Sequence, residues 1–325
     1  MAAIASFLGR RLIKSVFILF AIIVANFLLV RAAPGDPAMV MAGEAGAADE
    51  KFVAQLREQF GLDKPIYQQL GIYVAGVAQG DLGFSYRQQQ SVWSLIGQRL
   101  PATLILTGAA FVLALGAGIL LGTLAAMNVG RWSDSAITVV ALLSYATPIY
   151  WVGLMLIYLF SVQLGWLPAF GYETIGGGYT GWARVADVAE HLVLPVTTLG
   201  LFYMAVYARL TRASILEVRD MDFVKTARAK GLGEGRIVFK HILRNAILPV
   251  ITFAGIQAGQ LIGGSILIET VFAWPGIGRL AFDAVLQRDY QVLLGVFFVT
   301  SVMVILFNIL TDLVYSLIDP RIEVA

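Results

Sequence analysis

Residues 100–130 read LPATLILTGAAFVLALGAGILLGTLAAMNVG and contain no charged side chain. A helix needs about 20 apolar residues to cross a hydrocarbon core of about 30 Å, where every backbone amide must find an internal hydrogen-bond partner. Other charge-free stretches occupy 15–30, 135–172, 191–208, 245–268 and 290–311. Buried helices of a soluble protein would be shorter and more amphipathic. The sequence therefore predicts an all-α membrane protein that crosses the bilayer several times.

The stretch at 135–172 holds either one long span or two short ones. Its second half contains Trp166 and Pro168, which are typical of an exit at the membrane interface. Proline removes a helical hydrogen bond. We therefore predict one span over about 135–161, kinked near Pro148.

The distribution of basic residues predicts the orientation, because Lys and Arg are retained on the cytoplasmic side. With six spans and both termini in the cytoplasm, the inner segments are 1–14, 128–134, 209–245 and 316–325. These segments hold 14 of the 23 Lys and Arg residues in little more than half the length of the outer ones. A seventh span would place the basic segment 209–245 outside, so we reject it.

The first apolar run follows Arg10, Arg11 and Lys14 and precedes Ala32-Ala33, which resembles a small-residue cleavage site. Both a signal peptide and an uncleaved span fit this pattern. We expect an uncleaved span, and N-terminal sequencing of the mature protein would decide between them.

The amino-acid composition disfavours several kinds of functional site. The chain of 325 residues has no cysteine, two histidines (His191 and His241) and a net charge of +2. These numbers disfavour a disulfide framework, a metal site and nucleic-acid binding. The chain lacks a G-x-x-x-x-G-K-[ST] motif, and the glycines at 231, 233 and 235 lack the spacing of a dinucleotide fingerprint. We expect no enzyme activity and no cofactor in this chain.

The outer segment 32–99 begins with a turn at Pro34-Gly35-Asp36-Pro37. Short amphipathic helices are expected at about 49–60, 65–77 and 91–99. They form either a packed cap or a docking surface for an external partner, and both readings stay open.

The inner segment 209–245 has nine basic and four acidic residues. Asp222 is the expected N-cap of a short helix over 223–230, and Gly231-Leu232-Gly233 breaks it. A second helix starts at Glu234 and runs through Arg236 into the fifth span. The pattern predicts a helix–turn–helix that projects into the cytoplasm.

The spans carry no charge in their centres, and Glu269 and Asp312 stand at span ends. Because intramembrane charges mark ion pathways, this disfavours an ion-coupled pump. Small residues recur every four positions in the fifth span, which predicts close helix packing or a gating contact. Those residues are Gly255, Gly259 and Gly263. The same span holds Gln257 and Gln260, our candidates for pathway contacts.

Several strings, in this order, resemble the permease subunits of dipeptide, oligopeptide and nickel ABC importers that depend on a binding protein. They include Gly61-Leu62-Asp63-Lys64-Pro65, Gly80-Asp81-Leu82-Gly83, TARAKGL at 226–232, HILRNAILP at 241–249 and ETVFAWPGIGR at 269–279. The resemblance covers nearly the whole chain.

The resemblance implies a type I ABC importer permease fold in the bacterial inner membrane. Its domains would be 1–31 (first span), 32–99 (outer helices), 100–315 (five-helix core with the hairpin 209–245) and 316–325 (cytoplasmic tail). Lys225-Thr226-Ala227 and Gly231 stand where the family's E-A-A-x-x-x-G coupling motif would be, although the glutamate is missing. The residues expected to couple to the ATPase are Asp222, Lys225, Ala227, Gly231, Leu232 and Arg236.

The implied partners are a second permease subunit, two ATP-binding subunits that hold ATP and Mg, and an external solute-binding protein. The implied cargo is a di- or oligopeptide, with nickel chelates, glutathione or another small solute as alternatives. Three other classes stay open: an ion-coupled secondary transporter, an intramembrane enzyme and a lipid-binding scaffold.

Overall fold

The computed structural model describes residues 2–32, 39, 49–59, 63–85 and 87–318. The turn predicted at 34–37 and the tail beyond residue 318 lie outside this range. The long helices are α1 (Ala2–Ala32), α5 (Val92–Met127), α6 (Trp132–Ala146), α8 (Gly181–Arg219), α11 (Leu243–Gly264) and α14 (Tyr290–Ile318). The shorter elements are α3 (Glu50–Gln59), α4 (Ile66–Ala78), β1 (Phe84–Ser85), β2 (Gln90–Ser91), α7 (Ile149–Leu156), the π-helix η1 (Ile157–Gln163), α9 (Asp222–Ala229), α10 (Glu234–Arg236), the π-helix η2 (Ile237–Ile242), α12 (Ile266–Val271) and α13 (Ile277–Gln287).

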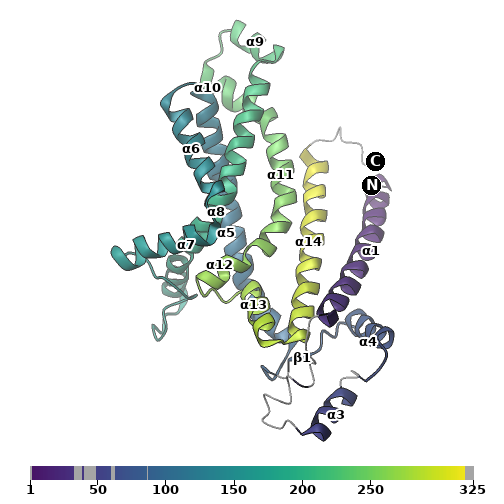
Figure 1. Cartoon of the computed structure of the whole chain (residues 1–325). Helices are drawn as coiled ribbons and strands as arrows, with labels where there is room; N and C mark the ends of the chain where they lie inside the picture. The colour runs from purple at the N-terminus through teal and green to yellow at the C-terminus, as the bar shows by residue number, and fades with distance from the viewer. Residues whose placement is uncertain (1, 33–38, 40–48, 60–62, 86, 319–325) are drawn as a thin grey trace.

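The long helices form one bundle with two distinct ends (Figure 1). The hairpin around α9 lies at one end, toward which the N-terminal end of α1 and the C-terminal end of α14 also point. Helices α3 and α4 and strand β1 lie at the opposite end, which we call the outer end. An even number of spans requires this arrangement, because both chain ends then fall on one side.

Within the described residues, four helical segments are long and apolar enough to cross a membrane: Val92–Met127, Gly181–Arg219, Glu234–Gly259 and Tyr290–Thr311. The pair α6 and α7–η1 qualifies as a fifth if it counts as one broken span. Helix α1 has a shorter apolar part, Ile13–Leu29, at the place of the first span predicted from the sequence.

The break in the third span is at the predicted place, although the sequence did not predict its size. Helices α6 and α7–η1 are bent by 106°. The residue before a proline is driven into extended conformation, and Thr147 accordingly has ψ 134°. Helix α6 therefore ends there, and Pro148 begins a new helix in another direction.

The prediction of a separate short helix at 91–99 was wrong. Ser91 caps α5 by accepting a hydrogen bond from the Ser94 N–H at 3.2 Å, and the helix then continues through Pro101 to Met127. The apolar side chains Val92, Leu95 and Ile96 are buried against α13 and α14. This amphipathic stretch is therefore the outer end of the second span.

Helices α5 and α8 form the centre of the bundle. A Cβ atom at Gly118 would overlap Tyr207, and one at Gly122 would overlap Ala208 and Thr211. Glycine at these two positions lets the two long helices approach closely.

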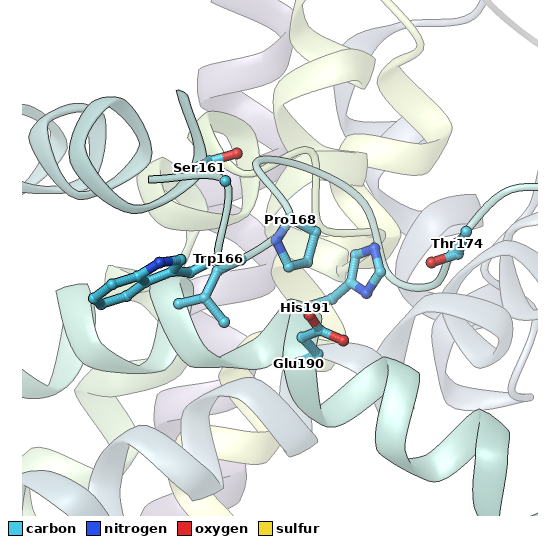
Figure 2. Close-up of a pocket in the computed structure, with 8 residues that line it drawn as sticks. Ser161, Trp166, Pro168, Thr174, Glu190 and His191 are labelled. Carbon is cyan, nitrogen blue, oxygen red and sulfur yellow. The ribbon is translucent and has the colours of Figure 1, made fainter. Parts of the chain in front are cut away.

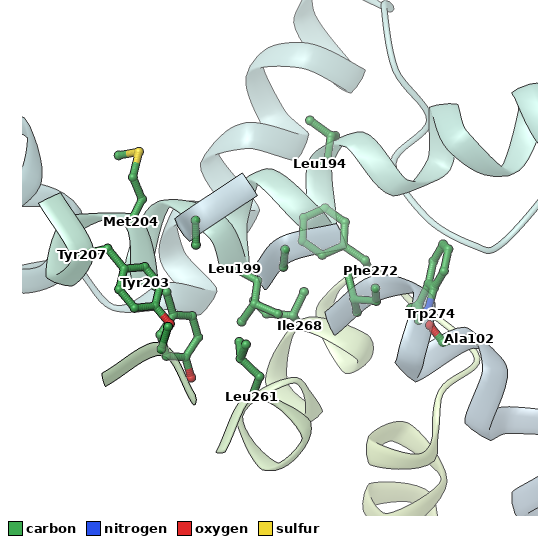
Figure 3. Packing of buried hydrophobic residues seen from close by; sticks show 14 of the residues in the cluster. Ala102, Leu194, Leu199, Tyr203, Met204, Tyr207, Leu261, Ile268, Phe272 and Trp274 are labelled. Carbon is green, nitrogen blue, oxygen red and sulfur yellow. Dashed lines mark hydrogen bonds between the residues drawn. The ribbon is translucent and has the colours of Figure 1, made fainter. Parts of the chain in front are cut away.

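The core at the outer half of the bundle surrounds two aromatic residues that follow α12 (Figure 3). Phe272 and Trp274 are buried among Leu199 and Ile268, and the Trp274 Nε1–H donates to the Ala102 carbonyl at 2.8 Å. The loop after α12 is thereby joined to the first turns of α5.

Glu269 is the polar centre of the same region and is fully buried. Its carboxylate accepts hydrogen bonds from Thr103 Oγ1 at 2.7 Å, Ser265 Oγ at 3.0 Å and the Arg279 N–H at 2.9 Å. A Cβ at Gly278 would lie 2.8 Å from the carboxylate. Glu269 stands near a span end as predicted, but it joins α5, α12 and α13.

Candidate functional site

The hairpin predicted within 209–245 consists of α9, α10 and η2 (Figure 1). Helix α9 ends in a Schellman motif, in which Gly231 adopts φ +73°. The Gly231 N–H donates to the Arg228 carbonyl at 2.9 Å, and the Leu232 N–H donates to the Ala227 carbonyl at 3.3 Å. The predicted glycine corner is therefore confirmed, and Gly231 is required there by its left-handed backbone.

An ion pair closes the corner from the outside. Arg228 Nε lies 2.8 Å from Glu234 Oε1, and a second guanidinium nitrogen lies 3.3 Å from Oε2. The hydrogen bond from Arg228 lowers the pKa of Glu234 below its usual value. The carboxylate therefore stays charged at neutral pH and keeps α9 and α10 together.

The predicted capping role of Asp222 was wrong. Met221 occupies the N-cap position, and Asp222 is the first residue of α9. Its carboxylate lies 2.9 Å from Lys225 Nζ, and this hydrogen bond lowers the pKa of Asp222. The acidic side chain instead suits the positive end of the helix dipole.

The six residues expected to couple to the ATPase fall on two faces. Ala227 is buried and Leu232 packs beside it, so both face the hairpin's own apolar core. Asp222, Lys225, Gly231 and Arg236 are exposed. The exposed face also presents Phe223 and Lys230, which sequence reasoning did not select.

The hairpin core is continuous with the spans. Val224 and Ala227 of α9 pack with Ile215 of α8, Ile237 of η2 and Ala246 of α11. Helix α9 therefore shares one apolar core with α8 and α11.

A second contact beside the hairpin was missed from the sequence. Arg212 of α8 donates to both oxygens of Asp134 on α6, at 2.7 and 2.9 Å. The Gly130 N–H also donates to this carboxylate at 3.2 Å. The topology prediction had placed both residues at the cytoplasmic border, which was the available signal, but sequence does not say which helices adjoin.

The predicted glycine ridge faces α14 along part of its length. A Cβ at Gly255 would overlap Thr311, and one at Gly259 would lie 3.4 Å from Val304. Gly263 is exposed with no neighbour within 4 Å of its added Cβ. Gln257 is half-buried on the same helix. The side chain of Gln260 lies outside the described part of the structure.

An open pocket of about 280 Å³ lies near the outer end, between the loop after η1 and α8 (Figure 2). Trp166 and Pro168 come from the loop, while Glu190 and His191 come from α8. The His191 Nδ1 is 2.8 Å from the Asp187 carbonyl. No group of three or more potential metal ligands occurs among the residues that the structure describes.

Comparison with known proteins gives consistent matches over the whole chain. Residues 118–324 match the family model of the binding-protein-dependent transport system inner membrane component, and residues 4–107 match the model of its N-terminal region. A di/tripeptide transport system permease protein of Pseudomonas aeruginosa is 42% identical, covering 98% of both chains. An oligopeptide permease of Bacillus subtilis is 40% identical (98% and 99% covered), and a glutathione permease of Escherichia coli O6:H1 is 41% identical (97% of each).

Two solved structures share the fold. The inward-facing MetNI methionine ABC transporter has a TM-score of 0.56 at 17% identity, covering 69% of this chain and 96% of that one. An amino acid ABC transporter gives 0.51 at 19% identity, with 68% and 92% covered. The predicted type I ABC importer fold is thus confirmed, and the chain belongs to the family of binding-protein-dependent transport system inner membrane components, the permease subunits of ABC importers.

Proposed function

We propose that this permease subunit forms half of a pathway for di- and oligopeptides in an ATP-driven importer. The observation that supports a peptide substrate is the sequence identity with known relatives. About two residues in five are identical to those of permeases named for peptides, over nearly the full length of both chains. The glutathione permease supports the same class, because glutathione is itself a tripeptide.

The hairpin around α9 is the proposed coupling site. It is stiff, because a Schellman motif and an ion pair fix its corner, and it shares an apolar core with two spans. Its free face combines the aromatic Phe223 with the charged Lys225 and Lys230. An aromatic anchor rimmed by charges is typical of a protein contact. ATP and Mg would be held by two ATP-binding partner subunits, one of which docks on this face.

The remaining partners follow from the same proposal. The hairpin end, with both termini and the tail 316–325, faces the cytoplasm. The outer helices within 32–99 receive substrate from a soluble binding protein, and a second, homologous permease completes the pathway next to the core 100–315.

Uptake by the reconstituted complex tests the substrate class. Proteoliposomes with ATP inside should accumulate a labelled dipeptide when the loaded binding protein is added. An excess of nickel chelate should compete poorly. Accumulation that persists without ATP and collapses with the ion gradient would instead support a secondary transporter.

Co-purification of the ATP-binding subunits tests the coupling site. Phe223→Glu should release them from the complex, since it places a charge in the centre of the contact. Phe170→Glu alters another exposed phenylalanine, in the outer loop, and should leave them bound. Retention of the ATP-binding subunits and of uptake in Phe223→Glu would refute the assignment.

A further inference from the structure

Arg209 on α8 is the first residue of the predicted inner segment 209–245, but its side chain contacts a residue deeper in the bundle. Helix α8 runs toward the hairpin, so Arg209 is one turn farther from it than Arg212, which pairs with Asp134. Side chains on a helix tilt toward its N-terminus, which here means away from the hairpin. The Arg209 guanidinium carbon accordingly lies 5.3 Å from the ring centroid of Tyr145.

The position of Tyr145 sets the depth of this charge. Tyr145 stands in the last turn of α6, eleven residues beyond Asp134. At 1.5 Å per residue, this is about 16 Å farther from the hairpin end. An arginine that faced lipid would extend toward the interface instead, because a charge in hydrocarbon is costly.

Arg209 also lacks a counter-charge within the described residues. Arg184, Arg212 and Arg228 each lie within 4 Å of a carboxylate, whereas the only described partner of Arg209 is the Tyr145 ring. Both Arg209 and Tyr145 are exposed on the surface of this chain. A bare cation at this depth is costly against hydrocarbon, so we expect this side of the chain to face water or an anion.

The geometry fits a particular ligand. Stacking on Tyr145 uses the face of the guanidinium and leaves its planar N–H edge available for a bidentate carboxylate. Phe202 stacks on Tyr145 at 5.3 Å, and Tyr203 meets Phe202 edge-on at 5.2 Å. The surface therefore offers one carboxylate site beside the exposed Tyr145 and the half-buried Phe202.

We propose that Arg209 binds the terminal carboxylate of a short peptide as it passes through the bundle, with Tyr145 and Phe202 beside the peptide side chains. This inference rests on the proposed peptide function. A carboxylate of the neighbouring permease subunit is the competing occupant.

Uptake and ATP hydrolysis by the reconstituted complex provide the first test. Arg209→Gln should reduce dipeptide uptake about tenfold or more, the value of one charge-assisted hydrogen bond. Stimulation of ATP hydrolysis by loaded binding protein should persist, so fewer peptides enter per ATP. Arg209→Lys should recover part of the uptake. Arg131→Gln removes an exposed charge from the α5–α6 turn and should match the wild type.

Because the chain has no cysteine, a thiol can report on the site directly. Ala213→Cys places one on the exposed face of α8, one turn from Arg209. Without binding protein, millimolar Ala-Phe should slow maleimide labelling of this cysteine, and its C-terminal amide should not. Adding Arg209→Gln should abolish the protection.

The outcomes separate the two proposals. If the wild type imports no peptide, both fall. If it does import peptides while Arg209→Gln matches it, or while the amide protects as well as the acid, only the Arg209 inference fails. Dissociation of the permease pair in Arg209→Gln, without peptide protection in the wild type, would assign Arg209 to the neighbouring subunit and overturn the inference.

Discussion

Replacing Glu269 by alanine should loosen the outer core more than any conservative change there. The hydrogen-bond donors to its carboxylate include the hydroxyls of Thr103 and Ser265, which can rotate toward helix carbonyls. The Arg279 N–H and the adjacent Gly278 N–H are fixed in the backbone and would lose their partner. An orphaned buried N–H costs about 1–3 kcal/mol, and the cavity left by the side chain adds to it.

Removing the charge offsets part of this loss, because a buried carboxylate is itself expensive. We therefore expect Glu269→Ala to cost about 3 kcal/mol. Glu269→Gln keeps the volume and retains one oxygen for the Arg279 N–H, while its amide can donate to the hydroxyl oxygens. Its expected cost is about 1 kcal/mol.

Thermal unfolding of the purified complex in detergent measures the difference, with Trp274 as a buried fluorescent reporter in the same core. Glu269→Ala should lower Tm by at least about 5 °C, and Glu269→Gln by about 2 °C. Glu173→Ala, which breaks an exposed pair with Arg184, is the control and should leave Tm unchanged. Equal Tm shifts for Glu269→Ala and Glu269→Gln would refute this reasoning, because the loss of the backbone hydrogen bond would then contribute nothing to the destabilisation.

Three further changes probe the other contacts. Gly255→Ala should cost about 1–3 kcal/mol by forcing α11 away from α14, whereas Gly263→Ala should be neutral or slightly stabilising, as thermal unfolding would register. Asp134→Asn should weaken the pair with Arg212 and reduce ATP-coupled uptake. Exchanging the two residues should restore part of the uptake. If Asp134→Asn left uptake unchanged, the pair would have no coupling role. The pKa of Glu234 is lowered in the folded hairpin. Its contribution to the stability of the hairpin is therefore fully present above the usual glutamate pKa, and it is lost as the pH falls through the lowered pKa of the folded state. Protection factors of the α9 amides, which correct for the intrinsic pH dependence of exchange, should therefore fall only at pH values below the usual glutamate pKa, and Glu234→Gln should remove that dependence.

Sequence reasoning succeeded where one physical rule acts alone. The charge-free stretches place the spans, because hydrocarbon tolerates few charges whatever the helices touch. Gly231 marks the hairpin corner because α9 ends in a Schellman motif, whose left-handed backbone conformation glycine adopts without strain. It failed where two rules compete: Pro148 predicts a break but not an angle of 106°, and an amphipathic run from Ser91 fits a surface helix as well as the end of a span.

The candidate site shows the same division. Local pattern identifies the hairpin but cannot tell that Ala227 faces inward while Phe223 faces outward, because that depends on where α8 and α11 lie. The partners of Glu269, Arg209 and Asp134 are distant in sequence, at separations of up to 166 residues. Their roles require the three-dimensional arrangement.

The course of α8 constrains how a push on the hairpin reaches the outer surface. This one helix of 39 residues carries the hairpin at one end and the outer pocket at the other. A straight helix of this length spans about 58 Å and would transmit any tilt unchanged. Pro195, however, interrupts its hydrogen bonding between the pocket residue His191 and the central contact with α5. Proline is the usual point at which a helix bends, so the inner two thirds of α8 can tilt with the hairpin while the outer third stays with its loop. Coupling and substrate reception can then move separately within a single helix.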